Sequence, residues 1–211
     1  MNTKEYCGSN QPAGCCSNKK IIMLREADLK LVQKKLDLVC HKGIQALELS
    51  AGSGQFSLQL APRVEHVTSL DVYESQIQHI RQQAVNSGID NITLSAEDLT
   101  MHNEKGKYDL VVSPAVLQIY EYREIFFKQL SGMTKPHAHL IFVVPYASIL
   151  RYGGDLLYNF SFTWKNRAFG KRQIRRLLAQ ADFEILDMKD TCLNTLITKG
   201  ILLFVHAQKT I

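Results

Sequence analysis

The 211-residue chain contains no run of about 18 consecutive apolar residues, so a transmembrane helix is not expected. The first 20 residues also lack the apolar core of a secretory signal, and we therefore expect a cytoplasmic protein without a membrane partner. Internal repeats and low-complexity tracts are absent as well. With 45% hydrophobic and 21% charged residues, the sequence predicts one domain that can bury a substantial core.

Cysteine is scarce and irregularly spaced. The five cysteines are an odd number without a repeating interval, so a disulfide framework is not expected; they are Cys7, Cys15, Cys16, Cys40 and Cys192. Three of them lie in the polar leader 1–20, which we interpret as a flexible arm with reduced thiols. A soft-metal or metalloid site in that leader is the alternative, and no metal site is predicted elsewhere.

The excess of positive charge is small. A formal net charge of +5 is compatible with nucleic-acid binding but does not require it. Much of the excess lies between residues 165 and 176, where basic side chains occur without an acidic one: Lys165, Arg167, Lys171, Arg172, Arg175 and Arg176.

The hydrophobic periodicity changes along the chain from helical to alternating. Residues 25–39 carry apolar side chains at helical spacing and predict an amphipathic helix. Strands are then expected at 43–50, 66–72, 92–98, 108–114, 138–146, 183–189 and 201–208, with helices at 54–63, 74–88, 122–133 and 171–181. This order predicts a doubly wound, mostly parallel seven-stranded α/β sheet with helices on both faces and a helical N-terminal extension. We expect a single domain over residues 21–211, with 147–170 as a substrate-facing insertion.

The turn after the first predicted strand contains two glycines, Gly52 and Gly54. A dinucleotide fingerprint would need a third glycine where Ser57 stands, and a P-loop would need a following Gly-Lys-Ser/Thr. Glu48, directly before the turn, would repel a pyrophosphate and attract a cationic amino group. The turn therefore indicates a nucleoside ligand that carries a positive charge and no phosphate.

The stretch Glu48-Leu49-Ser50-Ala51-Gly52-Ser53-Gly54 resembles the first motif of the class I S-adenosylmethionine-dependent methyltransferases. That motif is an acid, an apolar residue and then Gly-x-Gly-x-Gly, and here Ser50 stands in place of the first glycine. The resemblance covers roughly residues 40–146. It implies S-adenosylmethionine as the methyl donor and S-adenosylhomocysteine as the product.

The resemblance also implies roles at the ends of the next strands. Asp71 would accept hydrogen bonds from the ribose hydroxyls, while Val72 and Tyr73 would cover a face of the adenine. The adenine edge would meet the backbone after the third strand, with Glu97 or Asp98 as side-chain options. The implied cofactor-binding residues are Glu48, Ser50, Ala51, Gly52, Gly54, Asp71, Val72, Ala96, Glu97 and Ser113. The alternative is a fold without cofactor, in which Glu48 caps a helix N-terminus and Asp71 ends a solvated strand.

The methyl acceptor is harder to infer, because methyl transfer requires mainly alignment of a nucleophile with the activated methyl group. A general base helps only if the acceptor must lose a proton, so no catalytic residue is assigned. The Asn/Asp-Pro-Pro-aromatic motif of enzymes that methylate amide-like nitrogens is replaced by residues 113–116, Ser-Pro-Ala-Val. We expect a small-molecule acceptor, with Tyr120, Tyr152 and Trp164 as candidate substrate-binding residues. Alternatively, Tyr120 is a helix-start tyrosine with a solvated hydroxyl, and Tyr152 and Trp164 belong to a satellite core.

Three other functions stay open. The basic face of Arg172, Arg175 and Arg176 makes an RNA methyltransferase the second hypothesis, although such a face is more often simply solvated. A non-catalytic S-adenosylmethionine-binding protein is another, and a nicotinamide-dependent oxidoreductase is disfavoured by Ser57. The oligomeric state is not predicted.

Overall fold

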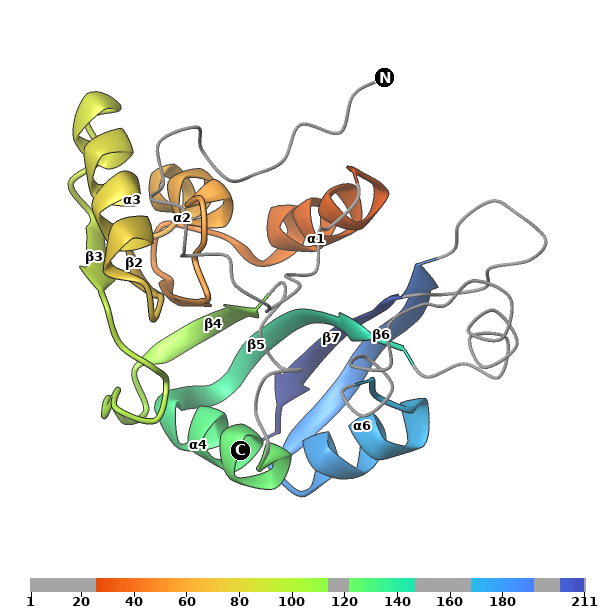
Figure 1. The fold of residues 1–211 in the computed structure, drawn as a ribbon. Helices are drawn as coiled ribbons and strands as arrows, with labels where there is room; N and C mark the ends of the chain where they lie inside the picture. The colour runs from red at the N-terminus through yellow and green to blue at the C-terminus, as the bar shows by residue number, and fades with distance from the viewer. Residues whose placement is uncertain (1–25, 114–121, 147–167, 192–201, 211) are drawn as a thin grey trace, which may run out of the picture.

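The computed structural model describes residues 26–113, 122–146, 168–191 and 202–210 (Figure 1). Within these ranges one seven-stranded sheet has the order β3-β2-β1-β4-β5-β7-β6. Strands β1 to β5 are parallel, and β7 runs antiparallel to its neighbours β5 and β6. The predicted doubly wound α/β fold is confirmed.

The strands are β1 (Gln45–Leu49), β2 (His66–Leu70), β3 (Ile92–Ser95), β4 (Tyr108–Ser113), β5 (Thr134–Pro145), β6 (Phe183–Thr191) and β7 (Leu202–Lys209). The helices are α1 (Glu26–Val39), α2 (Gln55–Leu60), the 3-10 turn η1 (Ala61–Arg63), α3 (Glu74–Asn86), α4 (Arg123–Met133) and α6 (Lys171–Ala179). Each strand and helix expected from the periodicity has its counterpart among these elements.

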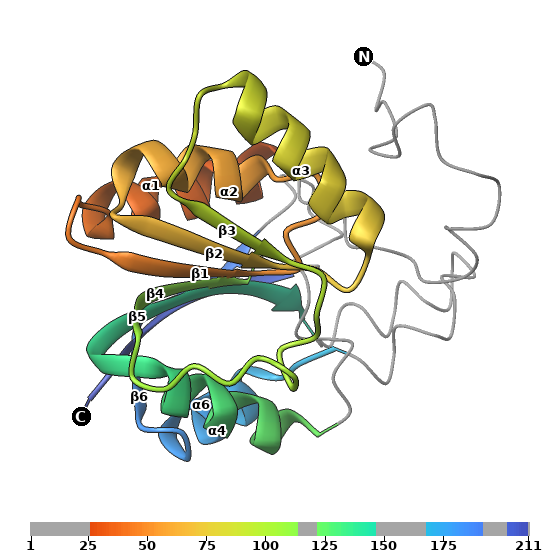
Figure 2. The ribbon, with the colours of Figure 1, turned by 90° about the vertical axis from the view of Figure 1, so that its left-hand side faces the viewer.

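Helices cover both faces of the sheet (Figure 2). α1, α2 and α3 lie on one face, and α4 and α6 lie on the other. The amphipathic pattern of α1 explains its position, because Val32 and Leu36 are fully buried against the sheet. The central strands β4 and β5 are apolar on both sides, since each face packs against its own layer of helices.

One strand begins earlier than the sequence predicted. We expected a strand from Ala138, preceded by a loop around Pro136, whereas β5 starts at Thr134. The pairing with β4 shifts register between Tyr108 and Leu110, and His137 adopts a left-handed φ of 62°. Proline cannot donate a ladder hydrogen bond, so its place beside a strand irregularity is physically consistent.

None of the helices within the described ranges is both long and apolar enough to span a bilayer. The leader 1–20 and residues 147–167 of the expected insertion lie outside these ranges. The end of the insertion is described: Phe169 is fully buried, and its N–H donates to the carbonyl of Pro145 across 2.8 Å. The guanidinium of Arg123 lies 4.0 Å from the centre of the Phe169 ring. The chain thus returns to the end of β5 before α6 begins.

Candidate functional site

The carboxyl ends of β1, β2, β3 and β4 meet at one edge of the sheet (Figure 2). β1 lies between β2 and β4, so the chain winds in opposite directions on its two sides. In open α/β sheets, ligands bind outside the carboxyl ends of the strands at such a reversal point. The candidate site is therefore at the turn between β1 and α2.

This turn is held in a left-handed backbone. Ser50, Gly52 and Gly54 have φ angles of 59°, 55° and 79°. The turn is fixed by the N–H of Ala51, which donates to Leu70 across 3.1 Å, and by the N–H of Gly54, which donates to Ala51 across 2.8 Å. Left-handed φ is costly for residues with a Cβ, so two glycines here follow from the geometry.

The two glycines answer different needs. A Cβ on Gly52 would meet nothing closer than the carbonyl oxygen of Ser50 at 3.8 Å, so this side of the turn is open. A Cβ on Gly54 would lie 2.7 Å from Cγ1 of Ile80, which is closer than packed atoms tolerate. Gly52 thus leaves room for a ligand beside the backbone, whereas Gly54 allows α2 to pack against α3.

Asp71 lies directly after β2 and is only 5% exposed. Its Oδ2 accepts a hydrogen bond from the N–H of Gly52 at 2.9 Å, and its Oδ1 accepts one from the N–H of Tyr73 at 3.0 Å. A carboxylate can accept about four hydrogen bonds, so each oxygen retains capacity for a hydroxyl of a bound sugar. The site therefore has a buried carboxylate group held beside the glycine turn.

Glu48 lies beneath the turn and is fully buried. Its Oε2 accepts a hydrogen bond from the hydroxyl of Ser57, and the hydroxyl of Ser69 is 3.2 Å from the same oxygen. The pKa of Glu48 is raised to about 7, mainly by burial and in smaller part by the negative charge of Asp71, while hydrogen bonds from Ser57 and Ser69 oppose the shift. The sequence alone identifies Ser57 only as the residue in place of the third glycine of a dinucleotide fingerprint. In the structure its hydroxyl is a hydrogen-bond partner of Glu48.

Two buried polar atoms lack a partner among the described residues at this edge. They are Oε1 of Glu48, at the end of β1, and Oγ of Ser113, at the end of the neighbouring strand β4. Unpartnered buried oxygens are costly, and a hydrogen-bond donor from a ligand would relieve that cost. This pair fits a ligand with a cationic amino group.

Apolar surface is exposed next to Asp71. Val72 and Tyr73 are 53% and 42% exposed. Such exposure is unusual for two consecutive large hydrophobic side chains that follow a buried strand. Their neighbours across the strand ends are Ala96, which is exposed, and Glu97, whose side chain is 28% exposed. The arrangement offers an apolar face and a polar edge, as a purine requires.

The candidate substrate residues Tyr120, Tyr152 and Trp164 lie outside the described residues. Tyr122, at the start of α4, is 68% exposed. On α6, Arg172, Arg175 and Arg176 are exposed as expected, and Arg176 forms an ion pair with Glu124 at 3.3 Å. The basic face is therefore partly neutralised by an acid of α4.

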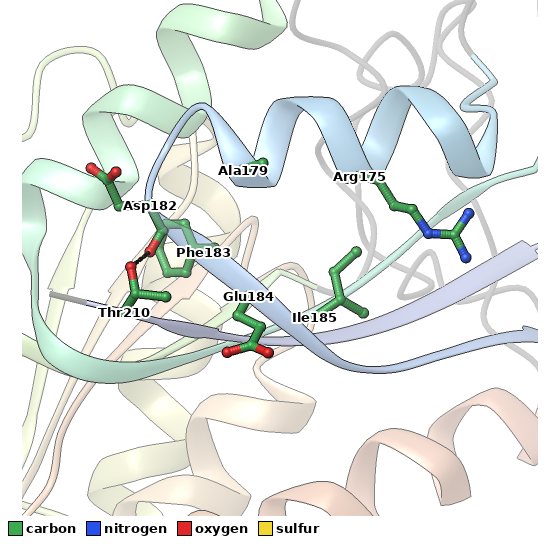
Figure 3. Close-up of a pocket in the computed structure, with 7 residues that line it drawn as sticks. All are labelled: Arg175, Ala179, Asp182, Phe183, Glu184, Ile185 and Thr210. Atoms are coloured by element: carbon green, nitrogen blue, oxygen red, sulfur yellow. Dashed lines mark hydrogen bonds between the residues drawn. The ribbon is translucent and has the colours of Figure 1, made fainter.

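A cavity of about 520 Å³ lies elsewhere, between α6 and β6 (Figure 3). Its lining residues are Arg175, Ala179, Asp182, Phe183, Glu184, Ile185 and Thr210. Phe183 begins β6 and Thr210 follows β7, so the cavity is at the opposite end of the sheet from the glycine turn. It contains no predicted cofactor residue.

In the described ranges, no cluster of three or more His, Cys, Asp or Glu side chains is suited to a metal ion. Cys40 is a free, half-buried thiol whose pKa is raised by burial. Cys7, Cys15, Cys16 and Cys192 lie outside the described residues.

Residues 47–142 match the family model described as a methyltransferase domain. Three relatives match over parts of the chain, and one of them is a tRNA/tmRNA (uracil-C(5))-methyltransferase of Azotobacter vinelandii, 30% identical over 93 residues, or 43% of the chain and 25% of its own length. The chain is 32% identical over 77 residues, or 36% of its length, to a 23S rRNA (uracil(1939)-C(5))-methyltransferase RlmD of Alkalilimnicola ehrlichii. It is 25% identical over 133 residues, or 60% of its length, to a probable (S)-tetrahydroprotoberberine N-methyltransferase 2 of Papaver bracteatum. The chain spans only 17% and 36% of these two relatives.

Solved structures share the fold at low sequence identity. A SAM-dependent methyltransferase from Methanosarcina mazei has a TM-score of 0.69 at 20% identity, covering 84% of this chain and 97% of its own. The magnesium protoporphyrin IX methyltransferase ChlM from Synechocystis PCC 6803, with bound SAH, has 0.70 at 18%, covering 88% and 83%. The [4+2]-cyclase SpnF has 0.71 at 16%, covering 86% and 80%. These likenesses establish the fold, which is shared by more than one chemistry.

Proposed function

We propose that this chain, which belongs to the class I S-adenosylmethionine-dependent methyltransferase family, transfers a methyl group from S-adenosylmethionine to a small-molecule acceptor. The observation that carries the proposal is the buried Oε1 of Glu48, unpartnered among the described residues, at the end of the strand that leads into the turn with the open side of Gly52. A phosphate would be repelled there, whereas the ammonium group of a methionine moiety supplies the missing donors.

The residues of the chain would bind and orient the cofactor. Asp71 would accept from the ribose hydroxyls with the lone pairs that Gly52 and Tyr73 leave available. Val72 and Tyr73, whose apolar side chains are exposed, would cover the adenine. When bound, the cofactor supplies a methyl carbon activated by a cationic sulfur. The chain then has to hold that carbon in line with the acceptor and exclude water.

A small-molecule acceptor is favoured by two observations. The Asn/Asp-Pro-Pro-aromatic motif is absent after β4, and the basic face of α6 is partly paired with Glu124 and, through Lys171, with Asp190. Two of the proteins similar to this chain carry names of small-molecule methyltransferases, for a tetrahydroprotoberberine and for magnesium protoporphyrin IX. The relative named for 23S rRNA keeps RNA as the second acceptor class.

Calorimetry with S-adenosylhomocysteine tests the cofactor proposal. We expect binding by the wild type and at least about tenfold weaker binding by Asp71→Asn, because hydrogen bonds to a charged acceptor contribute roughly 1.5–3 kcal/mol. Asp109→Asn is the matched control. Asp109 Oδ2 also accepts from a backbone N–H, that of Gln45 at 2.9 Å, but it lies near the amino end of β4. No binding by the wild type, or equal weakening in both variants, would refute the proposal.

The RNA alternative has its own measurement. If RNA is the acceptor, RNA affinity should fall steeply with salt and drop when Arg172, Arg175 and Arg176 are changed together to Gln. We expect neither, since these side chains lie on a solvated helix face. A strong salt dependence that the triple variant abolishes would favour RNA over a small molecule.

A further inference from the structure

A chain of hydrogen-bonded side chains runs from the start of β4 to the loop after β3. The hydroxyl of Tyr108 is 2.7 Å from Nε2 of His102. Nδ1 of His102 is in turn 2.7 Å from Oε1 of Glu97. Tyr108 is fully buried, whereas the side chain of Glu97 is 28% exposed. The chain therefore connects the sheet interior with the rim of the candidate site.

The donors along this chain point in one direction. Burial raises the pKa of Tyr108, so its hydroxyl keeps its proton and has one hydrogen to donate. The carboxylate of Glu97 can only accept, so Nδ1 of His102 carries the hydrogen that it donates to Glu97. In a neutral imidazole Nε2 then has no hydrogen and accepts the one from Tyr108. In this arrangement each hydrogen has an acceptor, and the imidazole is fixed in the Nδ1–H tautomer.

The loop that carries His102 is fixed to the body of the protein. The N–H of His102 donates to the carbonyl of Leu99 across 3.1 Å, and the side chain of Gln129 on α4 donates to the same carbonyl. Leu99 is 2% exposed. His102 thus acts on Glu97 from a fixed position.

Asp98 is engaged differently from Glu97. Its Oδ1 accepts from both the N–H and the hydroxyl of Thr100, at 2.9 and 2.8 Å, and so stabilises the turn. Of the two acids that the sequence offered for the adenine edge, Glu97 is the one held by a side chain that reaches back to the sheet core.

We propose that His102 and Tyr108 are positioning residues that orient Glu97 to accept a hydrogen bond from the exocyclic amino group of adenine. The inference rests on the proposed function, because it assigns an adenosyl ligand to this edge. A carboxylate has about four acceptor positions and His102 occupies one of them. A base with an oxygen in place of the amino group would direct a lone pair at the carboxylate and be rejected. Glu97 would then select adenine over a base with an oxygen in place of the amino group. His102 and Tyr108 would set the size of that preference, because they fix the orientation of Glu97.

The test compares two probes, S-adenosylhomocysteine and S-inosylhomocysteine, by calorimetry on the full chain. We expect the wild type to prefer the adenosyl probe. The preference should fall about tenfold or more in His102→Phe, since a charge-assisted hydrogen bond contributes roughly that factor or more. Tyr108→Phe, which retains the buried ring, should lower it several-fold. His102→Asn, whose amide can still donate to Glu97, should restore most of it.

A histidine elsewhere supplies the matched control. Nε2 of His66 is 2.8 Å from the hydroxyl of Thr93, at the amino ends of β2 and β3. His66→Phe should leave the preference at the wild-type value. A ratio unchanged in both His102→Phe and Tyr108→Phe would overturn this inference while leaving the proposed function intact. If the wild type bound neither probe, both this inference and the proposed function would be overturned.

A second readout needs no ligand. Nitrogen-15 NMR of the free protein distinguishes imidazole tautomers, and we expect His102 in the Nδ1–H form in the wild type. Tyr108→Phe removes the donor to Nε2 and should shift the population toward Nε2–H. An Nε2–H tautomer in the wild type would contradict the proposed direction of the hydrogen-bond chain.

Discussion

Oδ2 of Asp71 accepts a hydrogen bond from the backbone N–H of Gly52 across 2.9 Å, joining the end of β2 to the turn after β1. The same carboxylate accepts from the N–H of Tyr73, so one side chain orders the glycine turn and the start of α3. Glu48 lies beneath this turn and is held by Ser57 and Ser69. The two acids therefore differ in role: Asp71 shapes the rim, and Glu48 is a buried group whose charge depends on what binds.

The two glycines of the turn predict different costs of substitution. Gly54→Ala should lower the free energy of unfolding by about 2–4 kcal/mol, because it adds left-handed strain and a contact at 2.7 Å with Ile80. Gly52→Ala should cost only about 1–2 kcal/mol, from strain alone. Urea denaturation measures both. In a double-mutant cycle, Ile80→Ala should cost less in the Gly54→Ala background than in the wild type, and as much in the Gly52→Ala background as in the wild type. The same cost in all three backgrounds would contradict the assigned contact.

Ser50 is a non-glycine residue in the left-handed region, with a φ of 59°. Ser50→Gly removes strain of about 1–2 kcal/mol and loses roughly 0.4–1 kcal/mol to the greater entropy of the unfolded chain, so a net gain of up to about 1.6 kcal/mol is expected. Ser53, in the same turn, has no left-handed φ. Ser53→Gly should therefore destabilise. Thermal unfolding of the two variants decides, and a loss in Ser50→Gly as large as in Ser53→Gly would argue against the strain.

Glu48 predicts a loss of stability as the pH rises. Its pKa is about 7 in the folded protein against an ordinary 4.5, so the folded state binds the proton more tightly than the unfolded state. The stabilisation is complete below pH 4.5 and is lost as the pH rises through 7. Glu48→Gln removes this dependence. At pH 8 the variant should be the more stable protein, by at most roughly 3 kcal/mol, since one pKa unit corresponds to about 1.4 kcal/mol.

Denaturation of wild type and Glu48→Gln at pH 5 and pH 8 checks this expectation. The difference between the two proteins should be small at pH 5 and appear only at pH 8. A variant that is less stable by the same amount at both values would show that Glu48 does not titrate in this range.

His206 predicts the opposite dependence. Its pKa is lowered to about 4, mainly by burial and in smaller part by the neighbouring His139 and Lys35, while Asp187 opposes the shift. Its Nε2 is 3.1 Å from Nδ1 of His139, and α1 contributes Lys35 through an ion pair with Asp187 at 2.8 Å. Because the unfolded state takes up the proton first, stability is present above about pH 6.5 and is lost as the pH falls toward 4.

The variant His206→Gln retains a polar group near His139 but cannot titrate. Between pH 7 and pH 5 its free energy of unfolding should fall less steeply than that of wild type. His66→Gln is the control, because His66 lies at the outer end of β2. Parallel pH profiles for all three proteins would contradict the role of His206.

Much of the fold was predictable because burial imposes a period on the sequence. The uninterrupted apolar runs of β4 and β5 follow from burial on both faces, and the spacing of Val32 and Leu36 follows from a helix packed on one side. The start of β5 was not predictable. A proline usually ends a strand, and Pro136 is accepted within β5 because it lies beside an irregularity in the pairing with β4.

The site was predictable where it depends on the backbone and less so where it depends on side chains distant in sequence. Glycines and acids at strand ends follow from the motif. The contacts of Glu48 with Ser57 and Ser69, or of His102 with Tyr108, join different elements and have no sequence period. The substrate residues Tyr120, Tyr152 and Trp164 stay predictions. The sequence likewise could not show that Ile80 leaves no room for a Cβ at Gly54, because this contact depends on how α2 packs on α3.

Transfer of a labelled methyl group tests the central claim most directly. The full chain is incubated with S-adenosylmethionine labelled on the methyl group, in one reaction with an extract of small metabolites and in another with total RNA. We predict label in a metabolite, at a rate reduced by Asp71→Asn and not by Asp109→Asn. Label in RNA alone, or in neither fraction, would contradict the proposed function.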